Sequence, residues 1–252
     1  MLLKIATLSK KGGRESNEDA CDILFKKGIY CCVLSDGLGG HHGGEVASGI
    51  VVDHMIDCFN EFQECNKLAI ENLLHAADNA IIREQHLNSQ LMHMRATAVV
   101  LIIDTINNRA IWGHSGDSRL YCFRQDKIIM QTRDHSVSQN MVDAGYLQPN
   151  ELRSSPSRNQ LYAALGNDHF KVDVVSTEFP IMDRDVFLMC SDGLWEYIEE
   201  NEMERMLSSS DSVMEWLEIM ERQVLSRGGK GQDNYSAIAI WCEDLDEVTR
   251  FP

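Results

Sequence analysis

The chain has 252 residues, 44% of them hydrophobic, which is enough for a substantial core in one large domain or two small ones. Its formal charge of −16, from 39 acidic and 23 basic residues, argues against nucleic acid and against an anionic membrane surface as partners. The eight cysteines form no C-x-x-C pair, and no apolar run approaches the roughly 18 residues that cross a bilayer. We therefore expect a soluble, cytoplasmic protein without a disulfide framework or a zinc site.

The first half of the chain predicts strands, then a pair of helices, then strands again. Loose alternation of apolar residues predicts strands at 2–9, 20–25 and 29–35. Between residues 43 and 90 the apolar residues recur at helical spacing, which predicts two long helices with a break near 64–67. A meander of strands follows at 96–104, 109–114, 119–124 and 127–131, with a hairpin turn at 107–108.

The second half begins with a polar stretch, residues 132–166, which predicts a short helix at 136–144 followed by a mobile flap. After it we expect strands at 172–178, 185–190 and 235–242, helices at 201–207 and 212–227, and a solvated acidic end at 243–247. This order is not the βαβα alternation of a parallel sheet. It predicts antiparallel sheets with helix pairs packed outside, in a single domain over residues 1–252 whose flap covers 132–166.

The tetrapeptide Ser-Asp-Gly-Leu occurs twice, at residues 35–38 and 191–194, and each copy ends a short apolar run. A buried strand that ends in a carboxylate holds an oxygen ligand on a rigid support, and the following glycine leaves room beside it. Asp-Gly is also a common turn signal, so one copy alone would favour a tight turn. The glycine of the second copy, Gly193, could serve only that purpose.

Other acids occupy similar settings beside glycine or small polar residues at strand ends. They are Glu18, Asp19, Asp117 and Asp233. Any one of them could be an ordinary solvated acid, but together with Asp36 and Asp192 they predict an oxygen site for Mg²⁺ or Mn²⁺. A carboxylate shared by two ions would suit Asp36. The chain lacks both a Cys-x5-Arg sequence and a P-loop, which disfavours thiol phosphatase and P-loop chemistry.

These motifs give the chain a family resemblance that runs through almost its whole length. The matching segments are Arg14-x-x-Asn17-Glu18-Asp19, Asp36-Gly37-Leu38-Gly39-Gly40-His41, Gly44-Glu45-x-Ala47-Ser48, Ala96-Thr97-Ala98, Gly116-Asp117-Ser118-Arg119, Thr132-x-Asp134-His135-Ser136, Ser191-Asp192-Gly193-Leu194 and Asp233-Asn234. In this order they resemble the bacterial-type metal-dependent protein phosphatases of the protein phosphatase 2C (PPM) family. The resemblance implies an α+β fold, a four-layer αββα sandwich of two antiparallel sheets flanked by antiparallel helix pairs.

The resemblance also implies roles for the acids and for Arg14, and a cofactor of two to three Mg²⁺ or Mn²⁺ ions. Asp36 would bridge two ions, with the Gly37 carbonyl on the second, and Asp192 and Asp233 on the first. Asp117 would join Asp192 at a weaker third site, and Glu18 and Asp19 would hold waters on the ions. Arg14 would grip the substrate phosphate with its planar fork.

The leaving oxygen of a phosphoserine needs a proton, and its donor is left open. Eukaryotic members carry a histidine where this chain has Leu38, as expected for the bacterial branch. A water on a metal ion is our first choice, while His41 and His42 are candidates that could equally cap a helix or face solvent. His114 and His135 rank below them. Arg119 could be a structural ion pair, and Arg158 could bind substrate or hold the flap.

The expected activity is hydrolysis of phosphoserine and phosphothreonine in proteins, by direct attack of a metal-bridging hydroxide and without a phosphoenzyme. Expected partners are phosphorylated proteins, including a Ser/Thr kinase or its targets, and the protein is expected to be a monomer. Two alternatives stand beside it: a non-catalytic module of the same fold that binds a phosphoprotein or kinase, and a hydrolase of small phosphoesters. A degenerate, non-catalytic copy should have lost one of Asp36, Asp192 or Asp233, and none is lost.

Overall fold

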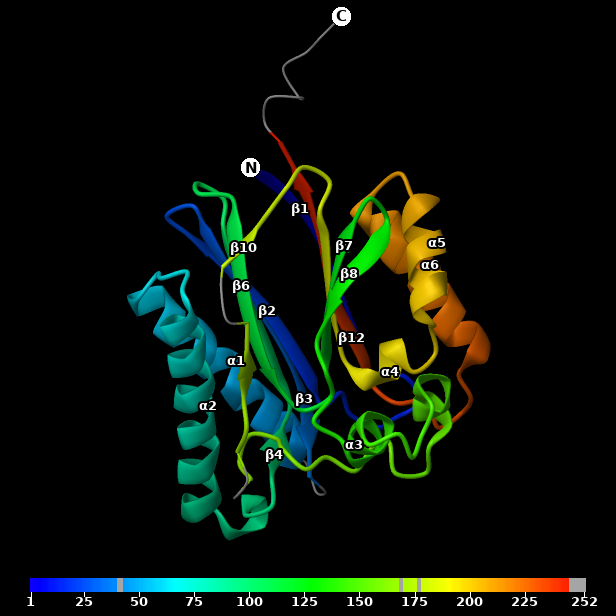
Figure 1. The fold of residues 1–252 in the computed structure, drawn as a ribbon. Helices are drawn as coiled ribbons and strands as arrows, with labels where there is room; N and C mark the ends of the chain where they lie inside the picture. The colour runs from blue at the N-terminus through cyan, green and yellow to red at the C-terminus, as the bar shows by residue number, and fades with distance from the viewer. Residues whose placement is uncertain (40–42, 168–169, 176–177, 245–252) are drawn as a thin grey trace, which may run out of the picture.

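Two antiparallel β-sheets face each other at the centre of the molecule (Figure 1). The computed structural model describes residues 1–39, 43–167, 170–175 and 178–244. One sheet has the order β1-β12-β11-β7-β8, with β1 Leu2–Lys10, β7 Arg119–Arg124, β8 Lys127–Gln131, β11 Val186–Cys190 and β12 Tyr235–Glu243. The other has the order β10-β6-β5-β3-β2, with β2 Asp19–Lys26, β3 Ile29–Leu38, β5 Ala98–Asp104, β6 Arg109–Ser115 and β10 Phe179–Pro180. Two short strands extend this second sheet: β4 Arg95–Ala96 pairs with β3, and β9 Asp173–Val174 pairs with β6.

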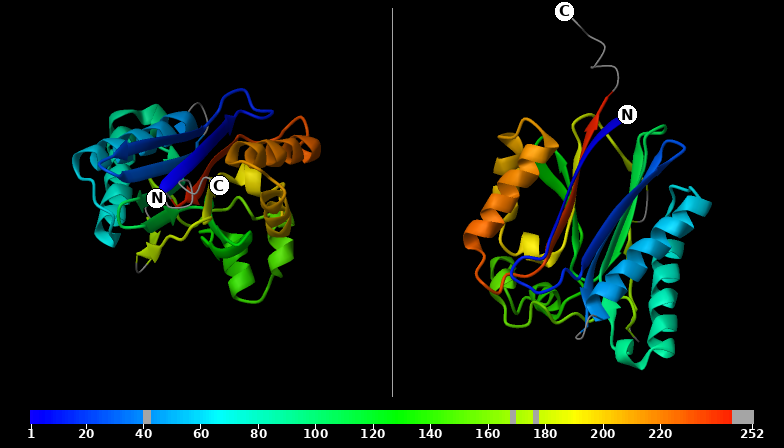
Figure 2. Two further views of the ribbon diagram at one scale, coloured as in Figure 1. Left: turned by 90° about the horizontal axis from the view of Figure 1, so that it is seen from above. Right: turned by 180° about the vertical axis from the view of Figure 1, so that it is seen from behind.

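Helices cover the outer face of each sheet, as both views of Figure 2 show. The helices α1 Gly43–Glu61 and α2 Lys67–Leu87 lie on the sheet that contains β3, and α5 Glu200–Ser208 and α6 Val213–Arg227 lie on the other. The side chain of Asn66 accepts a hydrogen bond from the Ala69 amide, and that of Ser212 from the Glu215 amide. These two caps explain where α2 and α6 begin.

Three buried apolar layers hold the four layers of secondary structure together. In the middle layer Leu34 and Val99 of one sheet share a cluster with Met189 and Ile238 of the other. The outer two layers join each sheet to its helices. One contains Met55 of α1, and the other contains apolar side chains of α6. The expected αββα sandwich is therefore confirmed, because apolar side chains on both faces of each sheet find a partner layer.

Short elements are where the structure departs from the predictions. Of the strand expected at 172–178, the described residues form only the two-residue strand β9. The strand β10 was not expected, because Pro180 lacks an amide hydrogen and suits a strand only at a sheet edge, which is where β10 lies. The helix α4 Asp192–Trp195 was also missed, because four residues are too few to show helical periodicity. The turn at 107–108 is confirmed, with Asn108 at a φ of 51°.

The segment 132–166 contains the short helix α3 Val137–Asp143 and the 3-10 helix η2 Pro149–Ser154, near α4 in Figure 1. A further 3-10 turn, η1 Ser89–Leu91, follows α2. All eight cysteines are free thiols, six of them buried. In the part of the chain that the structure describes, no helix is both long enough and apolar enough to cross a membrane.

Candidate metal centre

The predicted acids come together where strands of both sheets end. Asp19 of β2 lies directly opposite Asp36 of β3 in the antiparallel register. Asp192 follows β11, Asp233 lies two positions before the start of β12, and Asp117 lies in the turn from β6 to β7. Because neighbouring antiparallel strands start and end at the same edge, five acids that are far apart in sequence meet at one end of the sandwich.

The acids interact strongly with each other, as the pKa of Asp36 shows. Burial within the site raises the pKa of the Asp36 carboxyl well above its usual range, and the negative charges of Asp19, Asp192, Asp117 and Asp233 raise it further. The pKa of Asp192 is raised in the same way, first by burial and then by Asp117 and other acids. Like charges held together in a poorly solvated place attract cations, so this cluster is electrostatically prepared for metal ions.

Asp19 supplies a specific test of whether the residues fit a metal. Its Oδ2 accepts a hydrogen bond of 2.7 Å from the Ser191 hydroxyl, but its Oδ1 is buried and has no donor among the described residues. Burial chiefly raises the pKa of Asp19 to about 6, and the charges of Asp233 and Glu18 contribute. A buried carboxylate oxygen without a donor costs free energy unless a cation or a water on that cation satisfies it. The residues therefore fit the divalent ions that the resemblance implies.

As the described side chains stand, no three carboxylates of the acid cluster bring oxygens within 4.8 Å of one another. Among the described residues, the trio of potential ligand atoms that lie within 4.8 Å of each other is a different one, formed by His114, His135 and Asp173. The acid cluster is thus better suited to several ions that share ligands than to a single enclosed ion.

Gly37 and Gly44 allow the start of α1 to pass directly against the end of β3. A Cβ atom on Gly37 would overlap the Gly44 carbonyl, and one on Gly44 would overlap the carboxylate of Glu18. The Gly37 amide donates to the Glu18 carbonyl at 3.0 Å. The glycine after Asp36 is therefore required for close approach, and Glu18 lies beside it as expected for a residue at the edge of the site.

Asn234 holds the segment that carries Arg14 and Glu18. Its Oδ1 accepts from the Glu18 amide at 2.8 Å, and its Nδ2 donates to the carbonyls of Lys11 and Ser16 at 2.8 and 2.9 Å. All three side-chain bonds thus reach a segment more than 200 residues away. The sequence placed Asn234 in a motif, but its role could not be derived before the tertiary contacts were known.

Thr97 joins the end of β3 to the turn that carries Asp117. Its hydroxyl accepts from the Asp36 amide at 3.0 Å and lies 2.7 Å from the Ser118 hydroxyl, while its amide donates to the Asp36 carbonyl at 2.8 Å. Because both backbone groups of Asp36 bond to Thr97, the bridging carboxylate that we predicted stands on a rigid support.

Arg14 lies at the edge of the site, bound to one of its acids. Its Nη2 is 2.7 Å from Asp233 Oδ2, and both side chains are partly exposed. The guanidinium therefore neutralises part of the acid cluster in this structure.

The remaining predicted residues either make structural contacts or lie outside the described part of the chain. His41 and His42 lie outside the described residues. Arg119 is confirmed as a structural ion pair: it is buried, bonds to Asp134 at 2.7 Å and lies 3.5 Å from the Trp195 ring centroid. Arg158 is paired with Glu196, so it holds the flap onto the segment after α4. Gly193 is more than a turn residue, because a Cβ atom there would overlap the Asn234 carbonyl.

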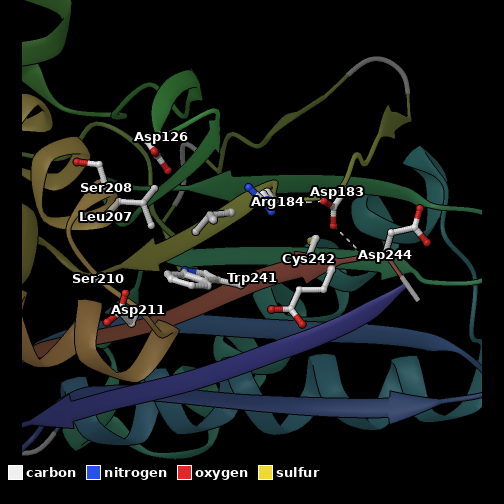
Figure 3. A pocket seen from close by; sticks show the side chains of 12 residues that line it. Asp126, Asp183, Arg184, Leu207, Ser208, Ser210, Asp211, Trp241, Cys242 and Asp244 are labelled. Carbon is white, nitrogen blue, oxygen red and sulfur yellow. Dashed lines mark hydrogen bonds and ion pairs between the residues drawn. The ribbon is translucent and has the colours of Figure 1, made fainter. Parts of the chain in front are cut away.

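One cavity lies far from these acids. It has a volume of about 590 Å³ and is lined by the start of β11, the end of β12 with Trp241, the end of α5 with Leu207, and Asp126 between β7 and β8 (Figure 3). The acids lie at the opposite ends of the same two strands, and eight residues of β12 correspond to about 26 Å. The size of this cavity therefore says nothing about the candidate metal centre.

The fold and the acid cluster together define an αββα protein with a divalent-metal centre. The sequence pattern of the protein phosphatase 2C family matches residues 9–229, and the chain belongs to this family. A serine/threonine phosphatase, stp, from Listeria innocua is 28% identical over 233 residues, which is 90% of each chain. Protein phosphatase PhpP from Streptococcus pneumoniae is 27% identical over 97% of this chain and 100% of its own.

Solved structures show the same similarity in three dimensions. The PstP/Ppp phosphatase of Mycobacterium tuberculosis has a TM-score of 0.82 at 27% identity, covering 97% of this chain and 100% of its own. A catalytic domain of PstP in complex with two manganese ions has a TM-score of 0.81 at 27% identity, covering 96% and 99%. The expected family, the fold and the activity of a metal-dependent protein-serine/threonine phosphatase are confirmed.

Proposed function

We propose that the protein hydrolyses phosphoserine and phosphothreonine in proteins at the acid cluster, without a covalent intermediate. The observation that carries this proposal is the set of four acids whose charges raise the pKa of Asp36. The described part of the site offers carboxylates at its centre, and the guanidinium of Arg14, bound to Asp233 at its edge, suits a phosphate group.

Asp36, the Gly37 carbonyl, Asp192 and Asp233 would hold two ions, and Asp117 with Asp192 would hold a third. Glu18 and Asp19 would bind waters on these ions, which would satisfy the free Oδ1 of Asp19. When bound, the ions supply Lewis acidity that neutralises phosphate charge and makes water a stronger nucleophile. That the ions are Mg²⁺ or Mn²⁺ remains a prediction.

Arg14 would bind the substrate phosphate and orient it. Its fork offers two parallel donors to two phosphate oxygens, and this contact would compete with the bond that Arg14 makes to Asp233. If Asp233 held an ion, less of its charge would remain for Arg14, and the guanidinium could turn to the substrate. We expect Arg14→Lys to raise KM more than it lowers kcat, since a lysine keeps the charge but loses the fork.

The flap over residues 132–166 would form one wall of the site and contact the phosphoprotein. Arg158 would act there indirectly, because its guanidinium is already paired with Glu196. A proton for the leaving serine oxygen would come from a water in the site or from His41 or His42. The kinase partner, the monomeric state and the cytoplasmic location stay predictions.

Hydrolysis of a phosphothreonine peptide in the presence of Mn²⁺ tests this function. We expect activity to disappear with a chelator and to fall by at least about a hundredfold in Asp36→Asn, because the amide cannot carry the shared charge. Activity that survives complete chelation, or an Asp36→Asn protein with an unchanged rate, would reject the proposal. Competition between the peptide and p-nitrophenyl phosphate separates a protein phosphatase from a hydrolase of small phosphoesters.

A further inference from the structure

His114, His135 and Asp173 form a compact cluster beside the turn that carries Asp117. Asp173 of β9 lies directly opposite His114 of β6, and the rings of His114 and His135 stack with their centroids 4.6 Å apart. Both histidines are buried, whereas Asp173 reaches the surface, where it also contacts Lys171. Two histidines and a carboxylate within 4.8 Å could in principle hold a transition metal.

The hydrogen bonds of His135 argue against a metal in this cluster. The Gly116 amide donates to Nδ1 of His135 at 3.2 Å, so Nδ1 carries no proton. A neutral ring then carries its proton on Nε2, which lies 3.1 Å from Asp173 Oδ2 and donates to it. A metal on Nε2 would leave both ring nitrogens without a proton, which is costly for a histidine. The cluster is therefore a chain of hydrogen bonds that runs from Asp173 through His135 to Gly116.

This chain ends on the residue that precedes Asp117. The His135 amide donates to the Gly116 carbonyl at 2.9 Å, so both backbone groups of Gly116 bond to His135. Gly116 has a φ of 103°, which only glycine adopts readily, and a Cβ atom there would lie 2.6 Å from a Thr97 methyl group. On the other side, Trp195 Nε1 donates to the Asp117 carbonyl at 3.0 Å. The backbone around Asp117 is thus held from two directions, and His135 supplies one of them.

We propose that His135, oriented by Asp173, is a positioning residue that sets the affinity of the ion bound by Asp117. The proposal rests on the proposed function only for the presence of that ion. Asp117 is buried and interacts with Asp192, which belongs to the main cluster. A small rotation of the Gly116–Asp117 peptide would move the Asp117 carboxylate away from Asp192, while Asp36 and Asp233 stand on other elements and would keep their places.

Two substitutions of His135 by side chains of similar size can separate its two side-chain hydrogen bonds, because each keeps one bond and loses the other. A glutamine reaches the position of Nε2 and can keep the bond to Asp173, but it has no acceptor for the Gly116 amide. An asparagine places its amide oxygen near the position of Nδ1 and can keep the bond to Gly116, but it loses Asp173. Asp173→Asn provides a third variant. Because the Asp173 side chain is 48% exposed, this substitution should leave the protein folded.

Calorimetry of Mn²⁺ binding to the full chain is the test, with thermal denaturation to confirm that each variant is folded. We expect the weakest Mn²⁺ ion to bind about tenfold less tightly in His135→Gln, with the tighter ions unchanged. His135→Asn should lose less affinity for this ion, because the asparagine keeps an acceptor for the Gly116 amide. Asp173→Asn should also lose less, because it keeps a neutral hydrogen-bond partner for His135. His114→Gln is the matched control: it removes the other buried histidine, whose Nε2 lies 2.8 Å from the Arg133 carbonyl and not against Gly116 in the described part of the structure.

Several results would overturn the inference. One is a His135→Gln protein that binds every Mn²⁺ ion with wild-type affinity, or that loses affinity equally for all ions. Another is a His114→Gln protein with the same loss as His135→Gln. A wild-type protein that binds only two Mn²⁺ ions would also overturn it. The readout is ion binding and not hydrolysis. A protein that shows the expected pattern of affinities but hydrolyses no phosphopeptide would therefore support this inference and reject the proposed function.

Discussion

Arg119 and Asp134 show what a single buried pair contributes beside a metal centre. Both side chains are about 3% exposed, and two hydrogen bonds of 2.7 and 2.8 Å join the guanidinium to the carboxylate. The ring of Trp195 covers the other face of the guanidinium. A permanent positive charge is thus enclosed among acids, and it lowers the pKa of nearby Asp117 against the larger effect of burial, which raises it to about 7.

Removing the charge of Asp134 should destabilise the protein, because it leaves the buried Arg119 guanidinium with only the more distant carboxylate of Glu200, 3.4 Å away. We expect Asp134→Asn to lower the free energy of unfolding by about 3–5 kcal/mol in urea denaturation. Asp143→Asn is the matched control, since Asp143 pairs with Arg133 at an exposed site and should cost less than about 1 kcal/mol. Equal effects of the two substitutions would contradict the structural role of the buried pair.

At the scale of the elements, close approach of backbones decides how the site is built. The helix α4 follows β11 directly and packs Gly193 against the Asn234 carbonyl at the start of β12. Asn234 in turn holds the segment with Arg14 and Glu18. One glycine without a side chain therefore lets three separate segments reach the acid cluster.

Gly193→Ala should disturb this arrangement, because the added methyl group would overlap the Asn234 carbonyl. We expect a loss of at least about 2 kcal/mol in the free energy of unfolding, with reduced phosphatase activity. The control is Gly49→Ala in α1, where no atom lies within 4 Å of the added carbon. An alanine in the interior of a helix should stabilise the protein there, by about 1 kcal/mol. A stable, fully active Gly193→Ala protein would show that α4 and β12 can move apart without harm.

For the molecule as a whole, two sheets bring together acids that repel each other, and ions must offset that repulsion. The ordinary pKa of these carboxyls is 3.8, and the fold raises it to about 6 for Asp19 and about 7 for Asp117. A raised pKa favours folding at low pH: the contribution is complete below 3.8 and is lost as the pH rises through 6 and 7. The ion-free protein should therefore lose stability over this range.

The stabilisation by Mn²⁺ should change in the opposite direction, because ions bind the deprotonated carboxylates. We expect the increase in Tm on addition of Mn²⁺ to be larger at pH 7.5 than at pH 5.5, by about 3 °C for each additional kcal/mol. Differential scanning fluorimetry with Mn²⁺ or with a chelator measures it, and Asp36→Asn should show a much smaller increase. An equal or smaller increase at pH 7.5 would contradict the role of these acids as ligands.

Much of the candidate site was predictable because its acids follow local patterns. Asp36 and Asp192 end apolar runs and precede glycine, and Asp117 and Asp233 lie in glycine-rich turns, so short segments of sequence reveal them. The partners of these residues were not predictable in the same way. The bond from Asn234 to the Glu18 amide, the bond from Thr97 to Asp36 and the free Oδ1 of Asp19 all join segments whose spacing in sequence carries no signal.

The amino-acid sequence by itself determined the order of strands and helices, the family and the identity of the acids, because hydrophobic periodicity and strand-end motifs are local properties. The tertiary structure alone decided which acids share one electrostatic field, that Arg14 is bound to Asp233, and that His135 holds both backbone groups of Gly116. These features depend on strand register and sheet packing, which place residues together that lie far apart in the chain, Arg14 and Asp233 being separated by 219 positions.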